Sequence, residues 1–568
     1  MGKKIVVIGG VACGPKAAAR ARRLDPEADI TIIEKGELLS YAGCGLPYFL
    51  SGDVKDVKGL METPIGVVRD TVFFKNVKDI KVLNRTLADS IDRKKKVVRV
   101  VNIKTGERSE VPYDKLVIAT GGMPFLPPIP GRDTLNSVFT LCSQACVEDA
   151  MMIDRALGKD EIKRAVIIGG GLIGLEITEA FVRRGLSVTV VEMLDRILPG
   201  LFDWEMSAFL TRHLAEKGVT VMAGTKVTEI KGDSAGNVTS VVTDKGDIPA
   251  DLVLVAVGVK PNVKLATDCG LTIGELGGIL IDGQMKTSDP DIYAGGDCVE
   301  QVGIVHGKQV YVPMGSTANK HGRVIGTNVV GGKEVFQGVS ATAIVKVFEY
   351  TAASTGLSEA AAKKAGFEVE TILSPSPDKA HFYPGAKLIG IKLVADKKTR
   401  KLLGAQIIGP GDVDKRIDVV VTALCFGATV DQVANFDLAY APPYSSAMDN
   451  IITAANIMRN KLDGTAKSVS PMEAMERIKR GTECVFLDVR MPAELDEQGR
   501  LPSDKVVHIP LGKLRTEAHT LPKDKEIIAF CKISLRGYEA AKTLEGLGFK
   551  DVKFLDGGIV MWPYEKRK

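Results

Sequence analysis

Short apolar segments that end in glycine recur along the first half of the chain. Lys3–Ile8 is a β-branched segment followed directly by glycines, and Ala165–Ile168 repeats this arrangement. Each is followed by a helical pattern and then by a second apolar segment, Ile30–Ile33 in the first case and Ser187–Val191 in the second. A strand, a glycine turn, a helix and a parallel strand make up the βαβ unit that binds a nucleotide. The two copies predict two nucleotide-binding domains.

The apolar pattern changes after about residue 335. Strands and helices that lack the glycine-turn arrangement follow, at Ala343–Phe348, Leu388–Val394, Leu402–Ile408, Asp414–Phe426 and Met448–Arg459. The tract Leu462–Ser470 is polar and predicts a linker. Beyond it, strands alternate with helices, at Pro471–Lys479, Cys484–Val489, Glu526–Phe530, Arg536–Leu547 and Lys553–Leu555. This alternation predicts a small separate α/β domain.

Composition narrows the class of protein. The 568 residues suggest three to four domains at roughly 150 residues each, and 45% hydrophobic with 26% charged residues is typical of a soluble multi-domain enzyme. The net charge of +5 is dilute over 568 residues, and the chain has no strong basic arm, so we expect no nucleic-acid partner. No apolar run approaches the roughly 18 residues of a membrane span, and no leader precedes the first strand, so we expect a cytoplasmic protein with no membrane partner. The nine cysteines are scattered and lack metal-ligand spacing, which favours individual thiols and no metal site.

The glycine turns indicate how the nucleotides are held. Backbone N–H groups at such a turn approach a pyrophosphate, and the positive end of the following helix meets its charge. The residues concerned are Gly9, Val11, Ala12 and Gly14 in the first turn and Gly169, Gly171, Leu172, Ile173 and Gly174 in the second. Val11 stands where the fingerprint has its middle glycine. Glu34 and Glu192 end the second strand of each unit, where a carboxylate binds the ribose hydroxyls. A tight turn without a ligand is the alternative.

Together with three further motifs, the two turns resemble those of the flavoprotein disulfide reductases over about residues 3–460. The motifs are Ala119-Thr120-Gly121, Gly258-Val259-Lys260-Pro261-Asn262 and the segment that ends at Asp297. The resemblance implies that the first turn, Glu34 and Asp297 hold FAD, and that Lys35, Ala119, Thr120, Gly121 and Ala318 belong to the same site. It implies that the second turn, Glu192 and Gly258 hold NAD(H). Because Glu192 would repel a 2′-phosphate, we expect NADH rather than NADPH.

One cysteine stands in the segment that follows the first βαβ unit, Ser40–Tyr48. Dithiol members of this family have a Cys-x4-Cys pair, whereas the residues four and five positions after Cys44 are Tyr48 and Phe49. A lone cysteine beside a flavin can form a mixed disulfide, a persulfide or a sulfenic acid. A packed, inert thiol is the alternative.

The same segment is similar to that of the coenzyme A-disulfide reductase, persulfide reductase and NADH oxidase branch, where Ser-Phe-Ala-Asn-Cys-Gly-Leu-Pro is typical. Tyr41 and Gly43 replace its phenylalanine and asparagine. The resemblance implies that the coenzyme A site includes Arg20, Arg22, Arg23, Ser40 and Tyr444. It also implies a homodimer in which Tyr383 and Tyr440 reach the other subunit's cysteine. Solvated arginines and interface packing of the tyrosines are the alternatives.

The last hundred residues carry a second candidate thiol. Cys531 ends an apolar strand and is followed by Lys532-Ile533-Ser534-Leu535-Arg536 and a helical pattern. A thiolate cradled by successive N–H groups at a helix start can carry sulfane sulfur. The segment resembles rhodanese domains, whose loop reads Cys-x-x-Gly-x-Arg, with Ser534 in the place of the glycine. The resemblance implies sulfurtransferase chemistry at Cys531 and Arg536, with a degenerate structural domain as the alternative.

These observations predict an α/β protein with two Rossmann-like three-layer domains, an α+β dimerisation domain and a C-terminal α/β rhodanese domain. The expected boundaries are 1–120 with 245–330 for FAD, 121–244 for NAD(H), 331–461 for dimerisation and 468–568 for rhodanese. The expected function is the NADH-dependent reduction of persulfide, polysulfide or coenzyme A-disulfide through Cys44. Two alternatives remain open: an NADH oxidase cycling through a sulfenic acid, and a sulfur-carrier or redox-sensing module.

Overall fold

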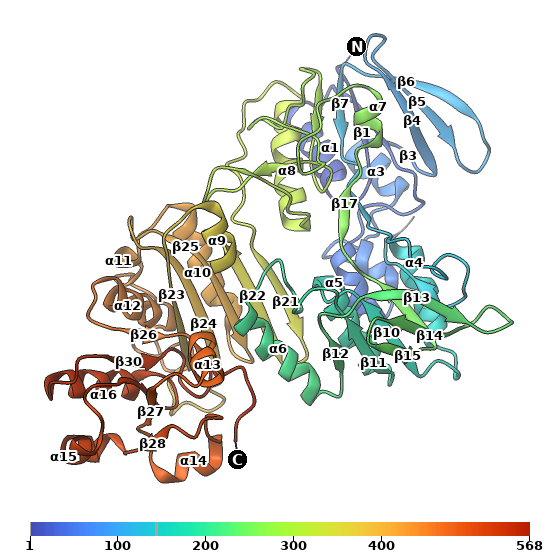
Figure 1. Ribbon diagram of the computed structural model, residues 1–568. Helices are drawn as coiled ribbons and strands as arrows, with labels where there is room; N and C mark the ends of the chain where they lie inside the picture. The colour runs from blue at the N-terminus through green and yellow to red at the C-terminus, as the bar shows by residue number, and fades with distance from the viewer. Residues whose placement is uncertain (1, 143–145, 568) are drawn as a thin grey trace. The chain divides into compact units, whose positions relative to one another are not determined.

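The computed structural model of the chain describes residues 2–142 and 146–567 (Figure 1). The chain forms two compact units. The first comprises Met1–Asp195 with Gly218–Val339, and the second comprises Arg196–Lys217 with Ser340–Lys568. In the described part of the chain, no helix has the length and apolar character needed to cross a membrane.

A five-stranded parallel sheet in the order β18-β7-β1-β2-β3 opens the first unit. Its strands are β1 (Lys4–Ile8), β2 (Asp29–Ile33), β3 (Lys81–Leu83), β7 (Lys115–Ile118) and β18 (Ile292–Ala294). Ile5 and Val7 face a core shared with α1 (Cys13–Leu24) and α8 (Gly315–Asn328), whereas Val6 and Ile8 face the antiparallel strands β4 (Thr86–Asp92), β5 (Val97–Asn102) and β6 (Arg108–Pro112). Because both faces are covered, β1 is apolar at successive positions.

A second parallel sheet in the same unit repeats this plan, in the order β12-β11-β10-β16-β9. Its strands are β9 (Val138–Phe139), β10 (Arg164–Ile168), β11 (Ser187–Val191), β12 (Thr220–Met222) and β16 (Leu252–Val255). The helices α4 (Cys146–Leu157) and α5 (Leu172–Arg183) belong to this half, and β13 (Val227–Gly232), β14 (Val238–Thr243) and β15 (Gly246–Pro249) form its antiparallel layer. The two three-layer halves confirm the prediction of two Rossmann-like domains.

The pairing and packing of two segments differ from the expected boundaries. The boundary at residue 245 put β16 in the FAD domain, but β16 pairs with β10 of the second sheet. The chain crosses between the halves at the antiparallel pair β8 (Gly122–Pro124) and β17 (Val259–Pro261). The segment Arg196–Lys217, expected in the NAD(H) domain, belongs to the second compact unit. The placement of both segments depends on strand pairing and packing between residues far apart in the sequence, which a local pattern does not predict.

The remaining elements of the first unit are short. They are η1 (Gly43–Gly45), α2 (Leu46–Leu50), η2 (Val57–Met61), α3 (Thr71–Lys78), α7 (Lys264–Asp268), β19 (Gln301–Val302) and β20 (Gln309–Val310). Of these, η1 and α2 matter most for function, because they carry the cysteine of the Ser40–Tyr48 segment. Ser40 and Ala42 each donate a backbone hydrogen bond, to Gly10 and Leu60 respectively, which anchors this segment on the protein.

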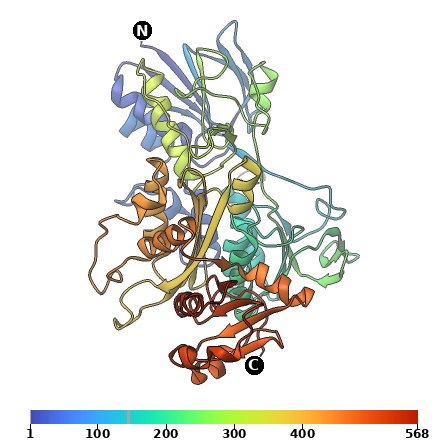
Figure 2. The ribbon, with the colours of Figure 1, turned by 60° about the vertical axis from the view of Figure 1, so that its left-hand side comes forward.

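The second unit contains a five-stranded antiparallel sheet in the order β21-β22-β25-β24-β23, seen as yellow strands in Figure 2. Its strands are β21 (Ala343–Val347), β22 (Tyr350–Gly356), β23 (Val369–Pro377), β24 (Leu388–Asp396) and β25 (Leu402–Gly409). It is accompanied by α6 (Trp204–Glu216), α9 (Glu359–Ala365), α10 (Val413–Cys425), α11 (Val430–Val433) and α12 (Asn450–Leu462). Helices α10 and α12 pack on the sheet, which buries β25 along its whole length. This is the α+β domain that the sequence predicted.

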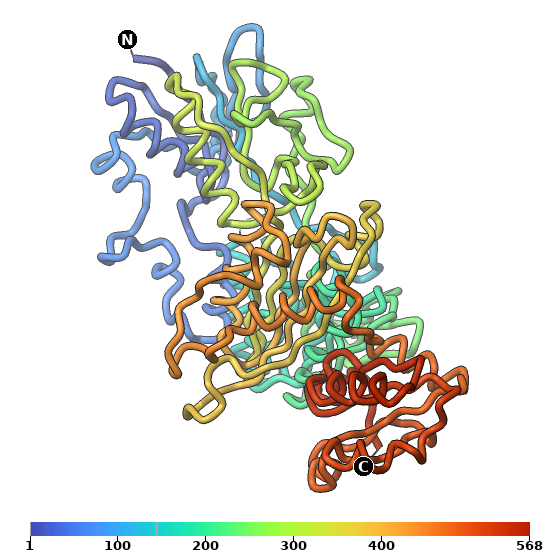
Figure 3. The backbone as a smooth tube through the Cα atoms, turned by 90° about the vertical axis from the view of Figure 1, so that its left-hand side faces the viewer, coloured from blue at the N-terminus to red at the C-terminus, as the bar shows by residue number. Residues whose placement is uncertain are grey.

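The C-terminal part of the second unit is a parallel sheet in the order β26-β30-β29-β27-β28. The strands are β26 (Ser468–Val469), β27 (Cys484–Asp488), β28 (Val506–His508), β29 (Glu526–Phe530) and β30 (Val552–Leu555). The helices are α13 (Pro471–Arg480), α14 (Pro492–Gln498), η3 (Leu511–Lys513), α15 (Leu514–Glu517), η4 (Ala518–Thr520) and α16 (Leu535–Gly546), the last of them in the red part of the tube in Figure 3. The predicted small α/β domain is confirmed.

Candidate active site: two glycine turns and two cysteine loops

The first glycine turn is shaped by backbone contacts that only glycine permits. Gly9 has a φ of +111°, and a Cβ there would lie 2.1 Å from the carbonyl oxygen of Ala119. A Cβ on Gly14 would lie 1.9 Å from the carbonyl oxygen of Gly9. Ala12 is the N-cap of α1 and makes no side-chain cap, so the first N–H groups of the helix face the turn without a side-chain acceptor. Val11 lies between these positions and leaves the turn intact.

Glu34 closes this turn from the end of β2. Its two carboxylate oxygens accept hydrogen bonds from the backbone N–H groups of Gly10, at 2.6 Å, and Gly36, at 2.7 Å. The carboxylate therefore lies at the mouth of the turn, where a ribose would bind. Lys35 is exposed next to it.

Asp297 is the residue that points most directly to a ligand site beside the first glycine turn. Its Oδ1 is buried without a hydrogen-bond partner, and burial raises the pKa of this carboxyl to about 6. A buried, unpartnered carboxylate oxygen is costly unless a ligand donates to it. The residues around it come from separate elements: Thr120 donates to the carbonyl of Asn262 at 2.6 Å, and Ala318 is buried in α8. The sugar hydroxyls of a flavin nucleotide fit this oxygen.

The second glycine turn repeats two features of the first, a positive φ at its first glycine and a close backbone approach at its last. Gly169 has a φ of +114°, and a Cβ on Gly174 would lie 2.1 Å from the carbonyl oxygen of Gly169. Gly171, the N-cap of α5, has open space where its Cβ would be, and no side chain caps the helix. Leu172 and Ile173 begin the helix, so their N–H groups are among those left for a pyrophosphate.

Glu192 has the same role at the second turn as Glu34 at the first. Its oxygens accept from the N–H groups of Gly170 and Leu194, both at 2.8 Å. Gly258, at the far side of the turn, has a φ of +110° and open space beside it. The repeated geometry gives each half one nucleotide cradle with a carboxylate at the ribose position.

Cys44 lies in η1, next to the start of α8. Its Sγ is 3.7 Å from the position of a Cβ built on Gly315. The residue is exposed, and the thiol's pKa is raised, chiefly by partial burial of the sulfur and then by the negative charges of Glu176 and Asp297. The tertiary structure thus brings the predicted redox cysteine to the same region as Asp297.

Glu176 is a site residue that sequence reasoning did not single out. It lies on α5, and burial together with the charge of Glu179 raises the pKa of its carboxyl to about 7. Its charge raises the pKa values of both Cys44 and Tyr48. No local motif marks it, because Glu176 and Cys44 are far apart in the sequence and meet only where α5 packs on α2.

The arginines expected to bind coenzyme A differ in how far their guanidinium groups are already hydrogen-bonded within the protein. Arg22 donates to the carbonyls of Pro26 and Asp79, both at 2.6 Å, and is therefore engaged by the protein. Arg20 donates to Thr327 at 3.1 Å, while Arg23 is exposed. Ser40 has a φ of +49° in the segment before Cys44.

The three predicted tyrosines lie on the surface of the second unit. Tyr383 is 39% exposed, Tyr440 52% and Tyr444 67%. Exposed aromatic side chains of this size are typical of surfaces that bind a partner.

The second cysteine loop lies between β29 and α16. Cys531 is fully buried, and Arg536 forms a side-chain hydrogen bond with it. Glu494 accepts two hydrogen bonds from the Arg536 guanidinium, at 2.6 and 2.7 Å, and this pairing lowers the pKa of Glu494 to about 2. Ser534, at the N-cap of α16, has a φ of +83° and donates to the carbonyl of Leu555 at 3.1 Å. The sequence identified Cys531 and Arg536 but not Glu494.

Comparison with known proteins places these features in a family. The model of the pyridine nucleotide-disulphide oxidoreductases matches residues 3–321, that of their dimerisation domain residues 342–452, and that of the rhodanese-like domain residues 470–564. An "NAD(P)H coenzyme A polysulfide/persulfide reductase" of Pyrococcus horikoshii is 37% identical over 81% of this chain and 99% of its own length. An "NADH oxidase" of Methanocaldococcus jannaschii is 32% identical over 81% of this chain and 99% of its own length.

Two solved structures resemble the chain over nearly its whole length. A NAD-dependent persulfide reductase from A. fulgidus is 46% identical, with a TM-score of 0.93 over 98% of this chain and 100% of its own. A protein from Bacillus anthracis described as CoADR-RHD is 34% identical, with a TM-score of 0.92 over 99% of this chain and 98% of its own. Both matches include the region of the second cysteine loop.

Proposed function

The chain belongs to the pyridine nucleotide-disulphide oxidoreductase family, and on this premise we propose that it is an FAD-dependent enzyme that uses NADH to reduce persulfide, polysulfide or coenzyme A-disulfide through Cys44. Its rhodanese domain handles sulfane sulfur at Cys531. The observation that carries the proposal is the position of Cys44, which lies beside the start of α8 and close enough to Asp297 for that carboxylate's charge to raise the pKa of the thiol. No cysteine stands within the next five residues to resolve an adduct, so its sulfur partner comes from a substrate.

The residues present fit the two nucleotides. The first turn with Glu34 and the unpartnered Oδ1 of Asp297 suits FAD, and the second turn with Glu192 suits NADH. A flavin bound there would supply the transfer of two electrons from NADH to a sulfur–sulfur bond at Cys44. Glu192 disfavours NADPH because its carboxylate would face the 2′-phosphate.

Cys44 acts as the nucleophile. Its thiolate attacks a sulfur of the substrate R–S–SH, forms a Cys44–S bond and expels HS⁻ or RS⁻, depending on which sulfur is attacked. Two electrons and two protons then cleave the adduct and restore the thiol. The net reaction is RSSH + NADH + H⁺ → RSH + H₂S + NAD⁺; coenzyme A-disulfide gives two thiols in the same way.

Cys531 accepts sulfane sulfur from an anionic donor. Arg536, held by both oxygens of Glu494, places its guanidinium at the Cys531 sulfur, where its positive charge attracts an anionic donor. Because Cys531 is buried, a persulfide on its sulfur is shielded from water. This loop is the feature that separates the protein from a simple oxidase.

The proposal includes a homodimer, supported by the match to the dimerisation domain. Tyr383 and Tyr440 would approach the other subunit's Cys44 and donate to the leaving thiolate, which their exposure permits. Arg23 and Tyr444, both exposed, would contact coenzyme A, with Arg20, Arg22 and Ser40 around them. A cytoplasmic location is part of the proposal, because seven cysteines are free thiols.

The test is anaerobic oxidation of NADH, and of NADPH in parallel, with coenzyme A-persulfide, inorganic polysulfide and coenzyme A-disulfide. We expect Cys44→Ser to abolish turnover and Cys531→Ser to remove only donors that need sulfur transfer. NADH oxidation by oxygen alone, with no response to any sulfur substrate, would establish the oxidase instead. Transfer of sulfur from Cys531 to a protein without NADH consumption would establish the carrier.

A further inference from the structure

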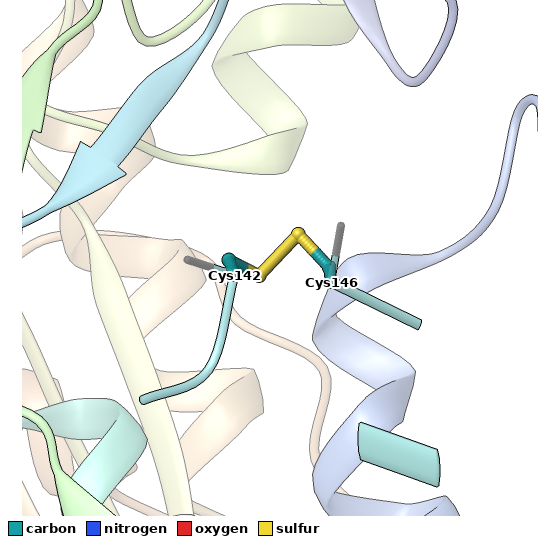
Figure 4. The surroundings of a disulfide bond; sticks show 2 residues. All are labelled: Cys142 and Cys146. Atoms are coloured by element: carbon teal, nitrogen blue, oxygen red, sulfur yellow. A yellow bond between two sulfur atoms is a disulfide. The ribbon is translucent and has the colours of Figure 1, made fainter. Parts of the chain in front are cut away.

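A pair of cysteines outside the active site departs from the expectation of individual thiols. Cys142 and Cys146 are joined by a disulfide (Figure 4). Both residues are partly exposed, so small molecules in solvent can reach them. Cys146 is the first residue of α4, so the bond ties the start of this helix to the segment that follows β9. The pair is the only disulfide among the described residues.

The start of α4 also contacts the segment that carries Cys44. The backbone N–H of Cys146 is one of the helix-start groups without an intrahelical acceptor, and it donates to the hydroxyl oxygen of Tyr41. Tyr41 stands three residues before Cys44, and α2, which follows Cys44, packs on α4. The hydroxyl that makes this contact is the group by which Tyr41 differs from the phenylalanine typical of the branch it resembles.

We propose that Cys142 and Cys146 form a second redox centre, which persulfides oxidise and which fixes the Cys44 segment through Tyr41. The inference rests on the proposed function only in its choice of oxidant, a hydropersulfide. In the disulfide state the N–H of Cys146 is held against the Tyr41 hydroxyl. In the dithiol state the start of α4 loses its covalent tie, and the segment around Cys44 is held less firmly. When sulfane sulfur is abundant, the oxidised pair therefore holds the Cys44 segment in the conformation of the structure.

The oxidation balances without a further reagent. One thiolate of the pair attacks the outer sulfur of RSSH, which forms a cysteine persulfide and releases RS⁻. The second thiolate attacks the Sγ of that persulfide, which forms the disulfide and releases HS⁻. The sum is 2 Cys–SH + RSSH → Cys–S–S–Cys + RSH + H₂S, in which the two cysteines are oxidised and the sulfane sulfur is reduced.

The oxidation can be followed on a single peptide. Cleavage after Arg132 and Arg155 yields residues 133–155, which contain Cys142 and Cys146 and no other cysteine. The full chain carrying Cys44→Ser and Cys531→Ser is reduced with dithiothreitol, freed of it, and exposed to glutathione persulfide without NADH. We expect the peptide to lose two hydrogens and one sulfide to be released per chain. A peptide that stays in the dithiol form overturns the proposal.

Coupling to the active site is measured by hydrogen exchange in the same protein. The amides of Ser40, Ala42 and Gly45 are hydrogen-bonded in the structure, and we expect them to exchange at least about fivefold faster in the dithiol state, the lower end of usual coupling strengths. Adding Tyr41→Phe should remove the difference, because the hydroxyl is lost. Equal exchange in the two states, with Tyr41 present, contradicts the proposal.

A matched control and an independent readout keep the two proposals apart. Adding Cys425→Ser, which removes an exposed thiol of the second unit, should leave both results unchanged, whereas Cys142→Ser should give the dithiol-like exchange permanently. Because the protein lacks Cys44 and no NADH is present, these measurements succeed or fail regardless of turnover. Failure of the NADH assay with a persulfide-sensitive pair would remove the proposed function and leave the redox centre.

Discussion

The thiol of Cys44 lies among negative charges rather than beside a cation. Partial burial, Glu176 and Asp297 all raise its pKa, so the thiolate fraction at neutral pH is small in the structure described. Glu176 itself titrates near neutrality, at a pKa of about 7. The ionisation of Glu176 therefore works against that of Cys44, because each negative charge raises the other group's pKa.

We predict that Glu176→Gln makes the protein more stable at pH 8 and has a much smaller stabilising effect at pH 5. The folded-state pKa of Glu176 is raised above its unfolded value, so the native state holds the proton more tightly and wild-type stability falls as pH rises from about 4.5 to 7. Glutamine removes the buried charge that causes this loss. Thermal unfolding at both pH values checks it; an equal shift in Tm at pH 5 and pH 8 would contradict the assignment.

The loop of Cys531 contains a serine in a backbone conformation that favours glycine. Ser534 has φ +83° and ψ −38°, which costs a non-glycine residue about 1–3 kcal/mol. Its buried hydroxyl recovers part of this through the hydrogen bond to the Leu555 carbonyl. The replacement of the usual glycine is therefore tolerated because the serine gains a local partner.

We predict that Ser534→Ala is less stable than Ser534→Gly by about 1–2 kcal/mol. Both changes remove the hydrogen bond, but only glycine relieves the backbone strain. Glycine itself should be close to wild type, because relief of strain offsets the lost bond of about 1 kcal/mol. Denaturation of the three proteins under one condition measures the order; alanine equal to glycine would show that the backbone is not strained.

At the scale of elements, the turn after β30 supports the Cys531 loop from behind. The N–H of Ile559 donates to the carbonyl of Cys531 at 2.9 Å, and that of Val560 to the carbonyl of Lys532 at 3.1 Å. A Cβ on Gly558 would lie 2.6 Å from both carbonyl oxygens, and its φ is +58°. Two loops thus fit together so closely that one glycine sets their spacing.

We predict that Gly558→Ala displaces the Cys531 loop and lowers sulfur transfer to cyanide by at least about tenfold, since 1.4 kcal/mol corresponds to a factor of ten. Coenzyme A-disulfide reduction, for which the proposed function uses Cys44 and not Cys531, should be retained. Gly546→Ala, at an open position in α16, is the matched control and should change neither activity. Equal loss of both activities would indicate general unfolding rather than a local effect.

At the scale of the second unit, a buried ion pair joins the rhodanese sheet to the dimerisation domain. Lys461 at the end of α12 donates to the carbonyl of Thr371 at 2.6 Å and pairs with Glu370 at 3.0 Å and Asp556 at 3.1 Å. Asp556 is 3% exposed and directly precedes the turn that supports the Cys531 loop. The rhodanese domain is therefore docked on α12 by a specific contact, although the polar tract before it had predicted only a linker.

We predict that Lys461→Met lowers stability by about 3–5 kcal/mol, the usual cost of removing one partner of a buried pair. The double change Lys461→Met with Asp556→Asn should recover much of the loss, because the buried Asp556 charge is gone and Glu370 keeps its ion pair with Lys397 at 3.2 Å. Denaturant unfolding of the three proteins tests this. A double variant no more stable than Lys461→Met would show that packing of the lysine stem, and not its charge, holds the two domains.

Site residues that lie close together in the sequence could be predicted from it, whereas partners far apart in the sequence could not. The glycine turns, Glu34 and Glu192 lie within single βαβ units, so their spacing alone placed them in the structure as expected. Glu176, in contrast, lies more than 100 residues from Cys44, and no periodicity connects them. Glu494 lies 42 residues before Arg536, and its pairing depends on how α14 packs near α16.

Residues a few positions apart within one turn or loop were enough to predict the glycine turns and the two candidate cysteines, and the alternation of strands and helices was enough to predict the fold class. The side chains that surround those thiols come from distant parts of the sequence, so their positions depend on tertiary packing. Packing sets Glu176 and Asp297 around Cys44, brings the start of α4 to Tyr41, and adds β16 to the second sheet. These contacts arise when packed elements bring distant residues together, and local pattern does not encode that packing.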